Sequence, residues 1–299
     1  MRVYCKSALS LALIFCIISC APPRPDHPII GAKDFTEQVI LGELLAQEIE
    51  AKTHLQVERR FYLAGSYICN QALIAHRIDA YVEYTGTALT AILKQPLPNT
   101  KNGRTPQQVY DTVSRLYQQR YHVTVGPPLG FSNSFAMVIP SNVARRLHIT
   151  TLSEAAKYTP HWRLGVGYEF EQRPDGLRGL EAAYGLKFDG PPRTMDLGLL
   201  YRALNDHQVD MIAGNTTDGP IQVSGLTILK DDKHFFPPYQ AVPLVSDAAL
   251  KRWPEIRLAL NALKDKVTEE NMRVMNEDVD GEHRDPAAVV REFRKREGL

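Results

Sequence analysis

Cysteine is scarce in this chain of 299 residues, which contains four. Three of them lie within the first 20 residues, so Cys69 is the only one in the remainder of the sequence. An internal disulfide in that remainder is therefore excluded. The fold must be stabilised by a hydrophobic core, which a chain of this length can build.

An excess of charge of one sign is also lacking. The sequence has 35 basic and 34 acidic residues, a net charge of +1, and no long run of either sign. This balance gives no indication of a nucleic-acid partner. With 44% hydrophobic and 23% charged residues, the composition is that of a globular protein long enough for two domains.

Long hydrophobic runs are absent except near the start of the chain. There, two basic residues precede the apolar run 8–18, which is too short to span a bilayer as a stable anchor. This pattern predicts a signal peptide over residues 1–20. Its end, Ile17-Ile18-Ser19-Cys20, resembles a bacterial lipobox, which predicts lipidation at Cys20 and a tether over residues 21–28. The alternative is an ordinary cleaved signal peptide whose cysteine is incidental.

Motifs for catalysis and metal binding are missing. The sequence has no His-Glu-x-x-His, Cys-x-x-Cys, Gly-x-Ser-x-Gly or Walker motif, and its nine histidines lack ligand spacing. We therefore predict no catalytic residue, no metal site and no cofactor. A cleft enzyme that uses Cys69 as nucleophile is the alternative, although Cys69 lies on the apolar side of a predicted short helix and has no basic neighbour to activate it.

What the sequence does contain is a regular alternation of strand and helix patterns, which predicts an α/β fold with mainly parallel sheets. Breaks rich in proline and glycine, near 126–130 and 237–238, predict two crossings between domains. We assign residues 29–131 and 238–299 to domain 1 and residues 132–237 to domain 2. Two α/β domains joined by two crossings predict a clamshell with its ligand site in the cleft.

Two helix predictions concern the ends of domain 1. Asp34 is predicted to cap the first helix, with Glu37 reaching back to form a capping box. Near the end of the chain, apolar residues between Leu250 and Leu263 recur at helical spacing and predict one long amphipathic stripe.

Aromatic and polar residues stand where the predicted strands end and the crossings begin. Tyr84 and Thr87 follow a strand, and Phe135 and Tyr239 lie at the two crossings. Ligands of α/β proteins bind at the carboxyl ends of strands. Aromatic rings that face a cleft can enclose a quaternary ammonium through cation–π contacts. Lys33, at another strand end, is either a surface lysine or a cation that meets an anionic ligand group.

Several short motifs, in this order, resemble the glycine betaine and choline binding proteins of bacterial osmoprotectant ABC importers. They are Ala32-Lys33-Asp34-Phe35-Thr36-Glu37-Gln38, Glu83-Tyr84-Thr85-Gly86-Thr87, Gly130-Phe131-Ser132-Asn133-Ser134-Phe135-Ala136, Arg173-Pro174-Asp175-Gly176, Thr216-Thr217-Asp218-Gly219 and Asp231-Asp232-Lys233 followed by Phe235-Phe236-Pro237-Pro238-Tyr239. The resemblance implies a two-domain periplasmic-binding-protein clamshell of type II, with two crossover segments.

The resemblance also implies an aromatic cage for a trimethylammonium group. Tyr84 and Tyr239 match cage tyrosines, and Phe135 stands at a position that is often tyrosine. Asn215 occupies a position where better-known members place another cage tyrosine. The missing ring implies either weak binding of simple betaines or a ligand that hydrogen-bonds Asn215, such as ergothioneine.

The resemblance also implies a set of residues that bind a carboxylate group of the ligand. The matching residues are Lys33, Thr87 and Arg173, and Gln38 and Asn133 match further polar contacts. A receptor for a zwitterionic amino acid, which uses the same three carboxylate-binding residues, is an alternative.

The resemblance therefore predicts an exported, non-enzymatic substrate-binding protein for a quaternary-ammonium or betaine ligand such as glycine betaine or choline. Its predicted partners are that small molecule and an ABC permease with its ATPase. The predicted location is periplasmic or on the cell surface, attached to the membrane through a lipid anchor.

Overall fold

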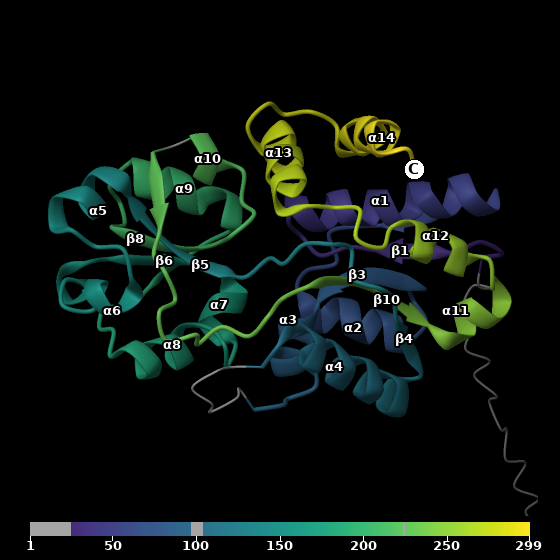
Figure 1. Cartoon of the computed structure of the whole chain (residues 1–299), viewed down its shortest axis with the longest axis horizontal. Coiled ribbons are helices and arrows are strands. Elements are labelled where there is room, and N and C mark those ends of the chain that lie inside the picture. The colour runs from purple at the N-terminus through teal and green to yellow at the C-terminus, as the bar shows by residue number, and fades with distance from the viewer. Residues whose placement is uncertain (1–24, 97–103, 224) are drawn as a thin grey trace, which may run out of the picture.

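Two five-stranded sheets organise the chain in the computed structural model, which describes residues 25–96, 104–223 and 225–299. Their strand orders are β2-β1-β3-β10-β4 and β7-β6-β8-β5-β9, and they lie in the two halves of the molecule (Figure 1). The predicted signal peptide, Cys20 and residues 21–24 of the predicted tether lie outside the described residues. So do residues 97–103 and residue 224.

The first sheet begins in the N-terminal part of the chain. The elements in order are β1 (Ile29–Gly31), α1 (Thr36–Thr53), β2 (Glu58–Arg60), α2 (Ser66–Ile74), β3 (Ala80–Tyr84), α3 (Thr85–Thr87), the π-helical turn η1 (Ala88–Ile92), α4 (Pro106–Tyr121) and β4 (Val123–Val125).

The second sheet is built from the middle of the chain. Its elements are β5 (Phe135–Pro140), α5 (Ser141–Leu147), α6 (Leu152–Ala155), the 3-10 turn η2 (Thr159–His161), β6 (Leu164–Val166), α7 (Tyr168–Gln172), α8 (Leu177–Tyr184), β7 (Arg193–Thr194), α9 (Leu197–Asn205), β8 (Met211–Asn215), α10 (Pro220–Val223) and β9 (Leu226–Ile228).

The chain then returns to the first sheet. The closing elements are β10 (Ala241–Ser246), α11 (Asp247–Arg252), α12 (Ile256–Ala262), α13 (Glu269–Asp280) and α14 (Pro286–Glu297). Strands of the first sheet thus fall within 29–131 and 238–299, and those of the second within 132–237. The domain boundaries themselves stay a prediction.

The prediction of mainly parallel sheets is confirmed for strand direction, because four of the five strands in each sheet run the same way and one runs against them. The first strand after each crossing, β5 or β10, pairs antiparallel with both of its neighbours. The other described pairings, β1 with β2 and β3, and β6 with β7 and β8, are parallel. A strand that follows a crossing enters its sheet from the end that faces the other half, so it runs against its neighbours.

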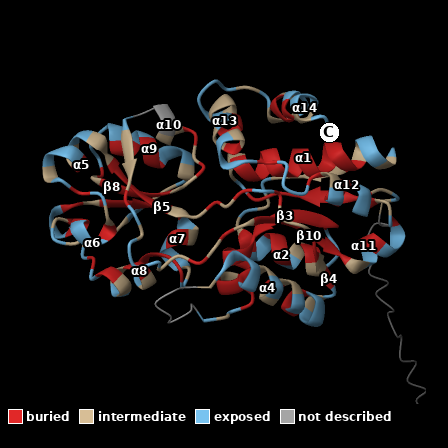
Figure 2. Cartoon of the chain, in the orientation of Figure 1, coloured by how far each residue is buried: buried red, intermediate tan, exposed pale blue. Residues whose placement is uncertain are grey.

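Helices cover both faces of each sheet, so each half has two cores. In the first half, Ile30 and Val82 pack under α1 and α12, while Ile29 and Tyr81 point to the opposite face. The alternation follows from the two-residue period of a strand. Figure 2 shows the buried strands between layers of half-exposed helices. The second sheet repeats this arrangement, with separate clusters on its two faces.

The two crossings lie side by side where the halves meet. Ser132 and Gln240 form an antiparallel bridge, and the N–H of Asn133 donates to the carbonyl of Tyr239 at 3.0 Å. The crossing segments therefore form a short two-stranded connection that positions residues 133–135 and 239 at the junction.

Both helix predictions at the ends of domain 1 are wrong. Helix α1 begins at Thr36 with Phe35 as its N-cap and no side-chain cap, so Asp34 and Glu37 form no capping box. The apolar stripe from 250 to 263 is divided between α11 and α12. Pro254, which lacks an N–H, stands at the break between them. Within the described residues, every helix is too short or too polar to span a membrane.

Candidate functional site

A cavity of about 1010 Å³ lies between the two halves. Its walls come from the ends of β1, β3 and β8, from both crossings and from α7, which agrees with the rule that α/β proteins bind ligands at strand ends. All the predicted ligand-binding residues except Gln38 line it: Lys33, Tyr84, Thr87, Asn133, Phe135, Arg173, Asn215 and Tyr239. Gln38 is buried but is not part of the cavity wall.

Three rings converge on this cavity. Phe135 packs edge-on against Phe170 with centroids 4.9 Å apart, and its centroid is 6.1 Å from that of Tyr239. The hydroxyl of Tyr239 donates to Asp175 at 2.6 Å, which fixes the orientation of this buried ring. Tyr84, which ends β3, is likewise buried.

The protein's own cations lie over these rings. Lys33 Nζ is 4.9 Å from the centroid of the Tyr84 ring, and Arg173 Cζ is 4.7 Å from that of Phe135. Both cations are also paired with carboxylates: Lys33 with Glu83 at 2.5 Å, and Arg173 with Asp175 at 2.5 Å. One face of each of these two rings thus already lies beside a positive charge of the protein.

Carboxylates outnumber cations in the described wall of the cavity. The basic residues are Lys33, Arg173 and Arg202, and the acidic ones are Asp34, Glu37, Glu169, Asp196, Asp206, Asp218, Glu277 and Asp280. Burial raises the pKa of several of these acids, including Glu37 and Asp280. The remaining acidic surplus favours a ligand with a positive group.

A family model described as the substrate binding domain of the ABC-type glycine betaine transport system matches residues 29–296. The chain belongs to this family. It is therefore a substrate-binding protein of an ABC transport system, and the two-domain clamshell predicted from the sequence is confirmed by solved structures of the same fold.

Individual relatives share about a third of the sequence. The carnitine transport binding protein of Listeria monocytogenes is 32% identical over 294 residues, which cover 96% of this chain and 94% of the relative. The ergothioneine transport permease/ergothioneine binding protein of Helicobacter pylori (strain G27) is 32% identical over 303 residues. The chain spans 53% of the length of this second protein.

A solved structure of a glycine betaine/carnitine/choline ABC transporter has the same fold. It superposes with a TM-score of 0.75 at 32% identity, covering 91% of this chain and 98% of that one. The substrate-binding family thus accounts for the arrangement of halves and crossings around the cavity.

Glu37, predicted from the sequence to form a capping box, has a different role in this cavity. Its buried carboxylate accepts hydrogen bonds from Tyr84 (2.5 Å), Asn133 (2.9 Å), Thr217 (2.5 Å) and Asn276 (3.0 Å). These donors come from β3, the first crossing, the second half and α13. Burial raises the pKa of Glu37 above its ordinary value, although the four hydrogen bonds act in the opposite direction. Glu37 therefore orients Tyr84 and connects the two halves.

The wall at Asn215 is polar. The Asn215 side chain donates to Asp218 at 3.2 Å, and the Tyr201 hydroxyl donates to the same carboxylate at 2.7 Å. Burial raises the pKa of Asp218 to about 6. Tyr201, which also lines the cavity, was not among the predicted residues, and its hydroxyl lies close to Gly214. Asn215 thus offers hydrogen bonding at the position where, as the resemblance implies, better-known members of the family place a ring.

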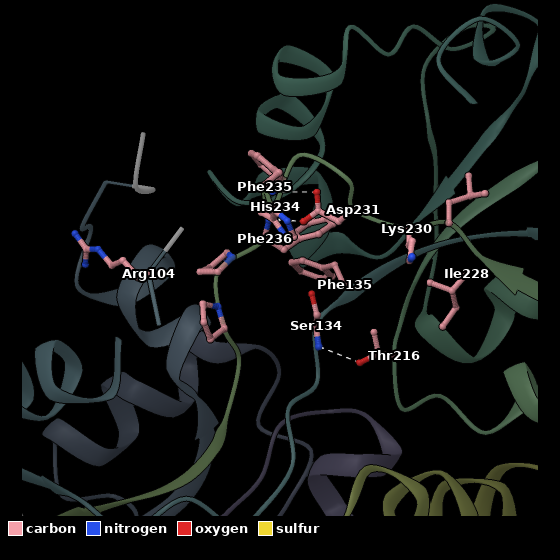
Figure 3. A pocket seen from close by; sticks show the side chains of 13 residues that line it. Arg104, Ser134, Phe135, Thr216, Ile228, Lys230, Asp231, His234, Phe235 and Phe236 are labelled. Carbon is pink, nitrogen blue, oxygen red and sulfur yellow. Dashed lines mark hydrogen bonds between the residues drawn. The ribbon is translucent and has the colours of Figure 1, made fainter. Parts of the chain in front are cut away.

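A second cavity, of about 640 Å³, lies beside the crossings (Figure 3). Phe135 lines both cavities. Asp231 accepts the N–H groups of Phe235 and Phe236, both at 2.9 Å, and so fixes the turn that begins the second crossing. The sequence motif that contains Asp231 is thereby explained as a structural one.

Gly86→Ala is expected to lower the free energy of unfolding by about 1–3 kcal/mol, the usual cost of overpacking. A Cβ at Gly86 would stand 2.5 Å from Tyr239 Cδ1 and 2.8 Å from the carbonyl oxygen of Pro238. Urea unfolding measures the change. The matched control is Gly198→Ala, because a Cβ at Gly198 meets nothing within 4 Å. Equal stability of the two variants would show that the Tyr239 ring is not tightly held.

Proposed function

We propose that this protein binds a quaternary-ammonium or betaine-type compound outside the cytoplasm and delivers it to an ABC permease with its ATPase. One observation carries the proposal: the rings of Tyr84, Phe135 and Tyr239 converge on a cavity whose wall is rich in carboxylates. Rings attract cations through their faces, and the acidic surplus stabilises the same charge. The named ligands of the relatives, glycine betaine, carnitine and choline, each contain a trimethylammonium group.

Closure of the two halves would complete the site. Tyr84 belongs to the first half and Phe135 starts the second, so a cation between them is desolvated when the halves approach. In such a receptor the ligand shifts the population toward the closed state, which the permease then recognises. The proposed domains remain 29–131 with 238–299, and 132–237.

The panel that tests the ligand class is glycine betaine, choline, carnitine and ergothioneine, titrated into the purified protein by calorimetry. Glycine, a zwitterion without methyl groups, serves as the control and represents the amino-acid alternative. We expect saturable binding of at least one of the four and none of glycine. Absence of binding by all four at millimolar concentration would refute the proposed ligand class.

Ergothioneine is the second candidate, and the polar wall at Asn215 favours it. The side chains of Asn215 and Asp218 can hydrogen-bond a polar ring, which glycine betaine and choline lack. A relative of 32% identity is named for ergothioneine. Asn215→Ala should then lower the affinity for ergothioneine more than the affinity for choline. An equal loss of affinity for both ligands would contradict this assignment.

We also propose that the protein is not an enzyme. Cys69, the alternative nucleophile, is fully buried, and burial raises the pKa of its thiol to about 12. A thiol with such a pKa is almost entirely protonated near neutral pH and is therefore a poor nucleophile. It also stands outside the cavity wall. Rapid modification of native Cys69 by a thiol reagent would contradict this conclusion.

Attachment to the membrane through lipid on Cys20 is proposed from the sequence pattern alone. Cys20→Ala should release the exported protein from the membrane fraction. Unchanged membrane association of that variant would refute the lipid anchor.

A further inference from the structure

Glu169, on α7 of the second half, reaches across the cavity to the first half. One of its carboxylate oxygens accepts the N–H of Ser66 at 2.6 Å, and the other accepts the Ser66 hydroxyl at 3.3 Å. Ser66 is the first residue of α2, whose N-cap, Gly65, supplies no side-chain hydrogen bond. Glu169 therefore caps a helix that belongs to the opposite half of the molecule.

The same carboxylate is held by a cation of the proposed site. Its second oxygen lies 3.2 Å from Arg173 Nη1, one helical turn further along the chain. Burial raises the pKa of Glu169, but the charges of Lys33 and Arg173 and the bonds from Ser66 outweigh it and lower that pKa. A Cβ at Gly65 would overlap Glu169 Oε1, so glycine permits this approach.

Two of the residues expected to bind a ligand carboxylate, Lys33 and Arg173, thus act on a carboxylate that the protein itself supplies. A guanidinium, a nearby ammonium and the N–H of Ser66 at the start of a helix together form an anion subsite, which Glu169 occupies. A ligand carboxylate that entered this subsite would compete with Glu169 for Arg173 and would be repelled by its charge.

We propose that Glu169 determines ligand specificity by occupying the anion subsite, so that it favours ligands with an ammonium alone over zwitterions that carry a carboxylate. The Glu169 side chain is 38% exposed, so it can rotate into solvent when a zwitterion displaces it. Zwitterions therefore bind with a penalty, whereas choline gains from the nearby negative charge. This inference rests on the proposed function of the cavity.

Choline and glycine betaine form the matched pair of ligands, because both contain trimethylammonium and only betaine has a carboxylate. Glu169→Gln should raise the ratio of betaine affinity to choline affinity by about tenfold, because it removes a like charge from the carboxylate and a counter-charge from the cation. Calorimetric titration of the purified protein measures both affinities.

The control is Glu171→Gln, which removes the same charge from the same helix. Glu171 is exposed, does not line the cavity and is hydrogen-bonded to Thr194. The proposal predicts an unchanged affinity ratio for this variant. An unchanged ratio in Glu169→Gln, or an equal shift in the Glu171 variant, would overturn it.

A test without any quaternary ammonium separates this inference from the proposed function. Acetate is titrated into Glu169→Ala and wild-type protein while the Ser66 amide signal is followed by NMR. The proposal predicts a saturable shift in the variant and none in the wild type, because only the variant has an empty anion subsite. Equal shifts in the two proteins, or no shift in the variant, would refute occupancy of the subsite by Glu169. This result does not depend on whether any of the four trimethylammonium ligands binds.

Discussion

Replacing Tyr239 with alanine is expected to weaken binding of choline and glycine betaine by about ten- to thirtyfold. The ring forms one wall of the cavity beside Phe135, with centroids 6.1 Å apart. A cation–π contact is worth up to about 2 kcal/mol when the cation is desolvated, and each 1.4 kcal/mol is a factor of about ten in affinity. Calorimetric titration of the folded variant measures the loss.

The conservative variant Tyr239→Phe separates the ring from its hydroxyl. It keeps the ring but removes the 2.6 Å hydrogen bond to Asp175. We expect an affinity within about threefold of wild type, with a stability loss of about 1–3 kcal/mol from the unmade bond. If the Tyr239→Ala variant bound choline and glycine betaine as tightly as the wild type, this ring would not be part of the proposed cage.

Asp175→Ala is expected to lower the free energy of unfolding by about 3–5 kcal/mol, which is the usual cost of breaking a buried ion pair. Asp175 is fully buried and accepts hydrogen bonds from Arg173 Nε at 3.0 Å and Nη2 at 2.5 Å. The Arg173 side chain is only 9% exposed, so water cannot replace the lost carboxylate. Without Asp175, the positive charge of Arg173 would be balanced, among the described residues, only by Glu169. Urea unfolding measures the change.

An exposed pair provides the matched control for this variant. Asp26 is bound to Arg252 at 2.6 Å, but its side chain is 92% exposed. Asp26→Ala should cost less than about 1 kcal/mol, because solvent screens such pairs. If Asp175→Ala cost no more than Asp26→Ala, the buried pair beneath the cavity would not stabilise the fold.

The sequence was sufficient to predict the fold class and eight residues of the cavity wall. The strand and helix periods and the two proline-rich breaks predict two α/β halves with a cleft, and family motifs place Tyr84, Phe135 and Tyr239 on its wall. The direction of the one antiparallel strand in each sheet was not predictable from periodicity, since a strand has the same two-residue pattern in parallel and antiparallel pairs. The antiparallel entry of β5 and β10 depends on how the crossings return the chain.

Carboxylates such as Glu37, Glu169 and Asp175 could not be assigned from sequence. Glu37 follows Asp34 at the spacing of a capping box, yet its partners include Asn133, Thr217 and Asn276, which are 96–239 positions away in the chain. Local spacing carries no information on such distant contacts. Glu169 likewise contacts Ser66 across 103 positions.

The central claim is that the cavity recognises the positive charge of a trimethylammonium group. Calorimetry with choline and glycine betaine, each beside its isostere in which an uncharged tert-butyl group replaces trimethylammonium, tests this claim most directly. We expect at least one trimethylammonium compound to bind the purified protein about tenfold or more tightly than its isostere, as one desolvated cation–π contact requires. Equal affinity within both pairs would contradict recognition of the charge by the rings of Tyr84, Phe135 and Tyr239.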